Sequence, residues 1–179
     1  QVVVLMRHPA SFISSLKRLG WVFPFQDLAV QPLLMRERLA PFASEIRDAA
    51  RDPEGGDLIS RGSLLWCIFA HAIDTYRQHH DDWLFVRHED LAHAPVDKFQ
   101  QMYGYLRLPF TRSVQQMIQQ HTSQDNPSEV ASDVTHKLQR DSARVTQTWK
   151  TRLTQNEIDE IYTAVQEYAP LFYDDASWE

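Results

Sequence analysis

An arginine and a serine eight residues apart are the first side chains whose spacing suggests chemistry. Arg7 directly follows the apolar run Val2–Met6, and Ser15 lies in the amphipathic segment that closes at Gly20. A guanidinium is a permanently charged, planar fork that binds phosphate or carboxylate oxygens, and a nearby hydroxyl adds a further hydrogen bond. The pair predicts an anion site. The alternative is a structural role, in which Arg7 pairs with an internal carboxylate and Ser15 hydrogen-bonds the preceding helical turn.

The elements around this pair favour the anion site. The run Val2–Met6 is mostly β-branched and carries no charge, which is typical of a strand covered on both faces of a parallel sheet. Pro9 suits the first turn of a helix, so the strand is expected to pass into a helix within about two residues. Arg7 then stands at the carboxyl end of a strand, where ligands bind in open α/β sheets.

A second group of cations lies near the end of the chain. These cations are Lys137, Arg140, Arg144, Lys150 and Arg152, and Asp141 and Ser142 lie between them. Arg140 and Arg144 are four residues apart, so in a helix they would share a face. A solvated basic face is the alternative interpretation of this charge pattern.

The remaining pattern predicts a helix-rich α/β chain forming a single domain over residues 1–179. A second buried strand is expected at Trp83–Val86, with a turn at Arg87–Leu91. The expected helices are Gln31–Arg51, broken at Pro41, then Leu58–His80, Pro95–Leu106 and Thr111–His121, and one that begins with a capping box at Thr154–Glu157.

Other polar and aromatic residues favour structural roles. Glu89 and Asp90 could supply a base, but helix capping or pairing with Arg87 is the preferred interpretation. His79 and His80 are adjacent and point to different sides of a helix end, so no metal site is expected. The aromatic segment Trp21–Val30 either packs onto the domain or lines an acceptor pocket, and packing is favoured.

Three stretches in this order resemble one family. VVVLMRHPASFISSLKRLGW (Val2–Trp21), WLFVRHEDLAHAP (Trp83–Pro95) and RDSARVTQTWKTRLTQNEI (Arg140–Ile158) are similar to segments of sulfotransferases that use 3′-phosphoadenosine 5′-phosphosulfate, PAPS. Each stretch alone is moderately specific, whereas three in the right order are considerably more so. The resemblance runs almost from end to end of the chain.

The resemblance implies a fold, a donor and a set of site residues. The fold would be the three-layer, P-loop-NTPase-like sulfotransferase fold, and the donor would be PAPS, with adenosine 3′,5′-bisphosphate (PAP) as product and no metal. Arg7 and Ser15 would hold the 3′-phosphate, with Arg140, Ser142 and, more weakly, Arg144 closing that end of the nucleotide site. The acceptor would be a hydroxyl or amine on a small molecule or glycan.

Two parts of the family's machinery have no counterpart in this sequence. There is no GxxxxGK[ST] phosphate-binding loop, and Gly55-Gly56 lies in an acidic turn without lysine. No histidine matches the family's general base, so the catalytic residue stays unassigned. We therefore expect the chain to be the C-terminal part of a sulfotransferase domain, inactive alone, its parallel sheet completed by a missing N-terminal portion; a homo-oligomer is also considered.

Composition and charge limit which kinds of protein this chain can be. The net charge of -6 argues against nucleic acid as a partner, and no apolar run is long enough to span a membrane. The single Cys67 excludes an internal disulfide and is compatible with a cytoplasmic protein. Two other functions stay open: another P-loop-like nucleotide enzyme such as a small kinase, and a non-catalytic interaction domain that uses the aromatic segment near Trp21.

Overall fold

The structure is a computed structural model that describes residues 1–53, 55–128 and 139–179. In chain order its elements are β1 (Val3–Met6), α1 (Pro9–Leu19), α2 (Gln26–Ala29), α3 (Pro32–Glu37), η1 (Ala40–Phe42), α4 (Ala43–Arg51), α5 (Leu58–His79), β2 (Leu84–Arg87), α6 (His88–His93), α7 (Pro95–Tyr105), α8 (Arg112–Thr122), α9 (Ser142–Val145), α10 (Trp149–Arg152), α11 (Gln155–Val165), η2 (Ala169–Leu171) and η3 (Asp175–Trp178). The helix-rich α/β class predicted from the sequence is confirmed.

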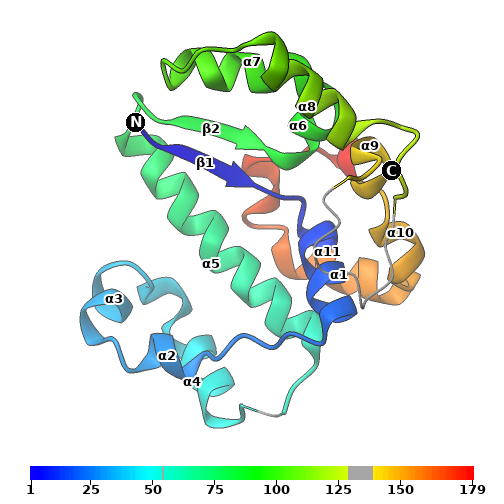
Figure 1. Ribbon diagram of the computed structural model, residues 1–179. Helices are drawn as coiled ribbons and strands as arrows, with labels where there is room; N and C mark the ends of the chain where they lie inside the picture. Colours follow the sequence, from blue (N-terminus) through cyan, green and yellow to red (C-terminus); the bar gives the residue numbers. More distant parts are fainter. Residues whose placement is uncertain (54, 129–138) are drawn as a thin grey trace.

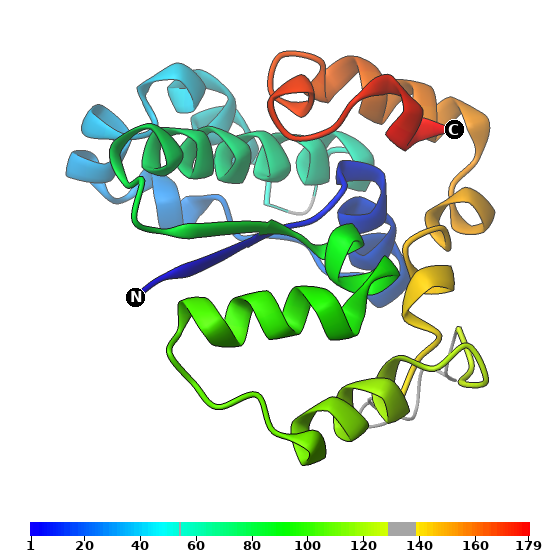
Figure 2. The same cartoon turned by 90° about the horizontal axis from the view of Figure 1, so that it is seen from above.

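The sheet is small and parallel within the described residues. β1 and β2 pair in parallel, with Val3 opposite Leu84 and Met6 opposite Arg87. Parallel pairing brings the carboxyl ends of both strands to the same edge, where Arg7 and α6 follow. In Figures 1 and 2, α5 lies on one side of this strand pair and α7 on the other.

α5 is the central helix of the core. It packs against α1 and α11, and its Trp66 is fully enclosed together with Ile13 of α1 and Ile161 of α11. Gly62 lets α1 approach closely, because a Cβ at this position would lie 3.2 Å from the side chain of Ile13. α1 begins two residues after Arg7. The packing of α1 in the core therefore determines the position of Arg7.

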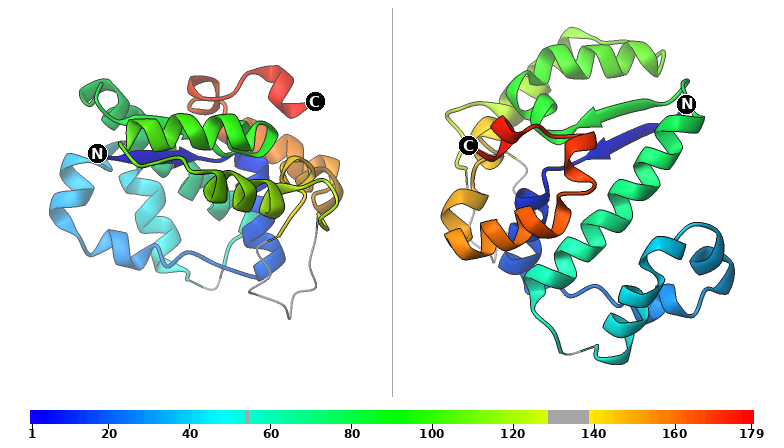
Figure 3. Two further views of the ribbon diagram at one scale, coloured as in Figure 1. Left: turned by 45° about the horizontal axis from the view of Figure 1, so that its top comes forward. Right: turned by 180° about the vertical axis from the view of Figure 1, so that it is seen from behind.

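The C-terminal segment crosses the carboxyl end of the strands. Figure 3 shows η2 and η3 next to the ends of β1 and β2 and close to α9. Tyr173, between these two turns, is buried and belongs to the main core. No helix in the described ranges has both the length and the apolar character to cross a bilayer.

Several local signals in the sequence are confirmed. Pro9 opens α1, and Gly20 ends it in the left-handed conformation with φ 62°. Thr154 and Glu157 form the expected capping box of α11. The break predicted at Pro41 is present, since η1 separates α3 from α4.

Three local predictions are wrong. The first strand is not covered on both faces in this chain, because Leu5 is 53% exposed while Met6 is buried. The segment predicted as a turn after β2 forms helix α6 from His88 onward. Arg140 and Arg144 do not share a helical face, because the buried Asp141 caps α9 and the helix begins only at Ser142.

A buried arginine holds the connection between α4 and α5. The Nη atoms of Arg61 donate hydrogen bonds of 3.1 to 3.4 Å to the backbone carbonyls of Phe23, Ala49, Asp52 and Gly55. Its guanidinium also lies over the ring of Phe25, 5.2 Å from the ring centre. One side chain therefore joins the aromatic segment after α1 to the loop before α5.

We expect Arg61→Met to lower the free energy of unfolding by about 3 kcal/mol, because it leaves several backbone carbonyls without their donor. The matched control is Arg51→Met. Arg51 is 75% exposed and paired with Asp48, so its loss should change stability by less than about 0.5 kcal/mol. Urea unfolding followed by circular dichroism measures both changes, and equal losses would contradict the role given to Arg61.

Candidate functional site

The Arg7 side chain is held by its own neighbours in the chain. Its backbone carbonyl accepts a hydrogen bond of 2.8 Å from Trp66 of α5, and its Nε donates one of 3.0 Å to the hydroxyl of Ser11. Among the described residues, no carboxylate lies within ion-pair distance of this guanidinium. The structural alternative for Arg7, neutralisation by an internal carboxylate, therefore has no support in this part of the chain.

The electrostatics around Arg7 are those of a partly buried cation. Burial lowers the pKa of Arg7, the negative charge of Glu89 opposes this effect, and the positive charge of Arg152 adds to it. A guanidinium stays protonated at neutral pH despite such a decrease. The site consequently offers a positive charge with little solvent around it, where an anion is bound more strongly than at an open surface.

Ser15 stands two turns into α1, on the same helix face as Ser11. Its hydroxyl donates a hydrogen bond of 3.0 Å to the Ser11 carbonyl, as the structural alternative for this serine expects. The oxygen of Ser15 still has lone pairs, and rotation about its side-chain bond redirects the proton. Arg7 and Ser15 thus each have Ser11 as a partner, Arg7 at its hydroxyl and Ser15 at its carbonyl.

A partly buried carboxylate, 17% exposed at its side chain, connects the two strand ends. Glu89, in the first turn of α6, accepts hydrogen bonds from the His8 backbone N–H at 3.0 Å and from the Tyr173 hydroxyl at 2.9 Å. Burial favours the neutral acid, but these donors and the His88 imidazole 3.9 Å away outweigh it and lower the pKa of Glu89 to about 2. Glu89 is therefore a fixed anion, which is unsuited to taking up a proton as a base near neutral pH.

The neighbouring acid, Asp90, also has a structural partner. Its two carboxylate oxygens accept hydrogen bonds from Nε and Nη2 of Arg87, at 3.0 and 2.7 Å. This bidentate pair confirms the preferred interpretation that Asp90 pairs with Arg87.

His8 occupies a cage of aromatic rings. It is 2% exposed, and the rings of Trp149, Tyr173 and Trp178 lie 5.4, 5.0 and 4.5 Å from its centre. Neither ring nitrogen has a hydrogen-bond partner among the described residues. Burial lowers the pKa of His8 to about 4, so the imidazole is neutral and packs as a ring beside Arg7.

The predicted C-terminal residues are anchored on a different part of the molecule. The Ser142 hydroxyl donates hydrogen bonds to the carbonyls of Ala92, at 2.7 Å, and Thr122, at 3.4 Å. The backbone N–H of Arg140 donates a hydrogen bond of 2.9 Å to the backbone carbonyl of His121. Arg144 is 78% exposed at its side chain and lies 3.7 Å from Asp141. No hydrogen bond between described residues joins these three to Arg7 or Ser15, and Lys137 of the same basic segment lies outside the described residues.

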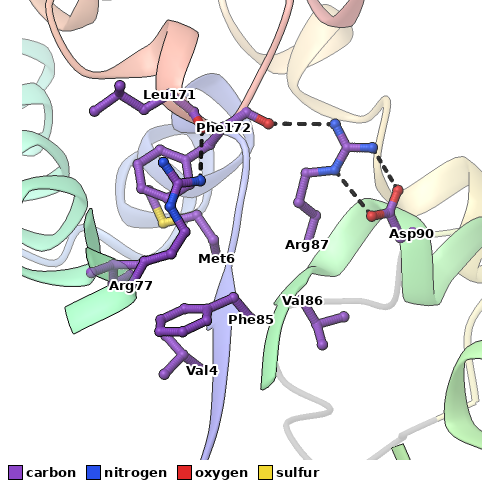
Figure 4. Close-up of a pocket in the computed structure, with 10 residues that line it drawn as sticks. Val4, Met6, Arg77, Phe85, Val86, Arg87, Asp90, Leu171 and Phe172 are labelled. Atoms are coloured by element: carbon purple, nitrogen blue, oxygen red, sulfur yellow. Dashed lines mark hydrogen bonds and ion pairs between the residues drawn. The ribbon is translucent and has the colours of Figure 1, made fainter. Parts of the chain in front are cut away.

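A separate cavity of about 240 Å³ lies between the sheet, α5 and η2 (Figure 4). Two arginines at its edge donate to the C-terminal backbone: Arg77 to the Leu171 carbonyl at 3.0 Å, and Arg87 to the Phe172 carbonyl at 3.4 Å. Each also has a carboxylate partner, so both charges are already neutralised. The apolar walls include Val4, Met6, Ile73 and Phe85. The two arginine hydrogen bonds at this cavity hold the C-terminal segment in place. Arg7 is not among the residues that line the cavity.

The comparison with known protein families gives the class. The family model described as Sulfotransferase domain matches residues 56–170, which is more than half of the chain. The chain belongs to the sulfotransferase family. No curated protein and no solved structure matches it.

The match covers two of the three stretches that carry the resemblance. In this sulfotransferase chain, Trp83–Pro95 and Arg140–Ile158 lie inside the matched residues, whereas Arg7 and Ser15 lie before them. Membership supports a transferase that moves a sulfuryl group and implies a small-molecule acceptor. Among the described residues, no group of three or more His, Cys, Asp or Glu side chains is placed to hold a metal ion.

Sequence reasoning did not find the partners that organise the site. Tyr173 and Trp178 come from the last seven residues, far in sequence from His8 and Glu89, and no local motif marks them. The usable signal was the density of aromatic residues in the C-terminal segment.

The buried His8 gives the sulfotransferase a pH dependence of stability. The unfolded chain takes up this proton near pH 6.5 and the folded chain only near pH 4, so stability falls as pH decreases through this interval. We expect the wild type to lose about 2 kcal/mol by pH 5 from this group, and His8→Phe to lack that loss. Urea unfolding at several pH values measures it, and parallel pH curves for the two proteins would contradict it.

Proposed function

We propose that this chain supplies the 3′-phosphate-binding half of a PAPS-dependent sulfotransferase. The observation that carries the proposal is the state of Arg7: a partly buried guanidinium at the carboxyl end of β1, with a serine hydroxyl and no described carboxylate as its partner. A phosphate dianion supplies the missing negative charge and accepts the remaining N–H donors. Family membership supports PAPS as the donor.

In the proposed reaction the acceptor oxygen or nitrogen attacks the sulfur, and the sulfur–oxygen bond to the 5′-phosphate breaks. The acceptor loses a proton and PAP leaves with the bridging oxygen. Arg7 and Ser15 hold the 3′-phosphate, which takes no part in bond making, so they contribute by positioning the donor. Arg140, Ser142 and Arg144 are proposed to close this end of the nucleotide site from the C-terminal segment.

The wider architecture belongs to the same proposal. Residues 1–179 form one domain, the C-terminal part of a three-layer, P-loop-like sulfotransferase fold, and the open edge of the two-stranded sheet receives further strands. A soluble, cytoplasmic protein that acts on a small molecule or glycan is the setting we propose. The exposed Leu5 of β1 supports additional cover over this strand.

Substitution of Arg7 tests the phosphate site. We expect Arg7→Gln to weaken PAP binding by about tenfold to a hundredfold, because it removes a charge-assisted hydrogen bond, and Ser15→Ala to weaken it by a smaller factor. The matched control is Arg18→Gln, which removes an exposed cation from the last turn of the same helix. Calorimetric titration with PAP, and with ATP for comparison, measures the effect. Wild-type PAP affinity in Arg7→Gln, or a preference for ATP, would refute the proposal.

We also expect the 179-residue chain to bind PAP without transferring sulfate. One phosphate clamp and no Gly-rich loop for the 5′-phosphosulfate leave the reacting group unpositioned. The measurement is transfer of radiolabelled sulfate from PAPS to a panel of phenol, amine and sugar acceptors, with PAP binding as the control for folding. Turnover by the homogeneous chain would show that this half is catalytically sufficient.

A further inference from the structure

Another cavity, of about 180 Å³, lies among the end of β2, α6, the start of α10 and the C-terminal segment. We call it the His8 cavity. The residues that line it include His8, Glu89, Asp90, His93, Trp149 and Tyr173. One water molecule takes up about 30 Å³ in the liquid, so this space is large enough for a small organic molecule.

His8 is a buried polar side chain that lacks a partner. It is 2% exposed, and neither of its ring nitrogens has a hydrogen-bond partner among the described residues. A buried polar atom without a partner costs free energy, and a ligand in the cavity can supply the missing bond. Burial keeps the imidazole neutral, so one ring nitrogen is an acceptor and the other a donor.

Hydrogen-bond acceptors prevail in the rest of the lining. Nδ1 of His93 lies 2.7 Å from the backbone carbonyl of Glu89, so Nδ1 is the donor and Nε2 of the neutral ring is left as an acceptor. Each carboxylate oxygen of Glu89 accepts one hydrogen bond and has a second lone pair. The Thr146 hydroxyl donates to the Ala143 carbonyl at 2.7 Å, which leaves its oxygen as an acceptor. A ligand here has to bring donors.

The side chains around the cavity carry an uncompensated negative charge. Asp90 is balanced by its bidentate pair with Arg87, which also lines the cavity. Glu89 accepts hydrogen bonds from the His8 backbone and the Tyr173 hydroxyl, both neutral, and no lysine or arginine among the described residues forms an ion pair with it. The His88 imidazole, 3.9 Å away, is charged only when protonated. The cavity therefore favours a cation.

We propose that the His8 cavity binds a primary ammonium group. Glu89 supplies the opposite charge, and a ring nitrogen of His8 accepts one of the N–H bonds. An ammonium brings three donors and one positive charge, whereas a hydroxyl brings one donor and no charge. The aromatic rings in the wall add a further attraction for a cation. Arg7 and Ser15 are not among the lining residues, so the proposal does not depend on the phosphate site.

NMR titration of the 179-residue protein with ethylammonium tests the site at constant ionic strength. We expect the side-chain resonances of His8 and Trp149 to shift saturably. Ethanol, a neutral probe of the same size, should bind at least about tenfold more weakly, because it lacks the charge. Tetramethylammonium has the charge without N–H donors and should also bind at least about tenfold more weakly.

Three results of this titration would overturn the proposal. One is the absence of a saturable shift with ethylammonium. Another is equal affinity for ethanol, which would show a polar cavity that takes up water and small solutes without selecting a charge. The third is equal affinity for tetramethylammonium, which would show that the protein attracts cations without the proposed hydrogen bonds.

Substitution of His8 tests the acceptor. His8→Phe keeps an aromatic ring in the cage and removes both nitrogens, so it should weaken ethylammonium by about tenfold. The matched control is His79→Phe, at an exposed histidine of α5 that does not line the cavity, and it should change the affinity by less than about twofold. Wild-type affinity in His8→Phe would contradict the proposal.

Gln147 gives a test at an exposed position, where the substitution leaves the core intact. It lines the same cavity. Gln147→Lys should weaken ethylammonium by about threefold and Gln147→Glu should strengthen it by a similar factor, because each changes the charge at the cavity. Neither should alter the weak binding of ethanol. Equal ethylammonium affinity in the wild type and both variants would show that no cation binds there.

Discussion

The hydrogen bond between Glu89 and the His8 backbone joins two strand ends that are 81 residues apart in sequence. It sets the direction in which the chain leaves β1, and the Tyr173 hydroxyl on the other carboxylate oxygen adds the C-terminal segment to the same junction. Such a partly buried carboxylate is stable as an anion because hydrogen-bond donors compensate its charge. The position of Arg7, one residue before His8, follows from this junction.

The arginines of this chain differ in which groups accept their hydrogen bonds and balance their charge. This difference distinguishes the arginines with a structural role from Arg7. Arg61 is surrounded by backbone carbonyls, and Arg77 and Arg87 each combine a carboxylate with a carbonyl. The donors of Arg61 are satisfied by carbonyls, and the charges of Arg77 and Arg87 are balanced by carboxylates. Arg7 has a serine hydroxyl instead, which satisfies one donor and none of the charge. A partly buried charge in this state is a common property of ligand sites.

Features specified by neighbouring residues could be predicted from the sequence. Pro9 and Gly20 bound α1 through their own backbone preferences, and the capping box of α11 lies within four residues. The prediction that Arg140 and Arg144 share a helix face was wrong, because their spacing alone does not show where the helix begins. Asp141, a strong N-cap residue between them, carried that information.

What could not be predicted depends on contacts between distant segments. The spacing of Arg7 and Ser15 indicated an anion site, but Ser11, which is a partner of each, has no signal that separates it from Ser14. The closeness of α10 to α1 arises from the packing of both against the core around α5 and α11. Sequence patterns describe which face of each helix is apolar, and not which two helices meet.

The surroundings of Arg7 also explain why Glu89 does not neutralise its positive charge. The chain as a whole carries a charge of -6, which opposes the approach of a polyanionic nucleotide. At physiological salt, charges more than about 8 Å away are largely screened, so the balance within a few ångströms of Arg7 decides whether an anion binds. Glu89 lies close enough to act on Arg7, yet its two oxygens are directed to His8 and Tyr173. Because both oxygens are engaged in this way, Glu89 forms no ion pair with Arg7 among the described residues.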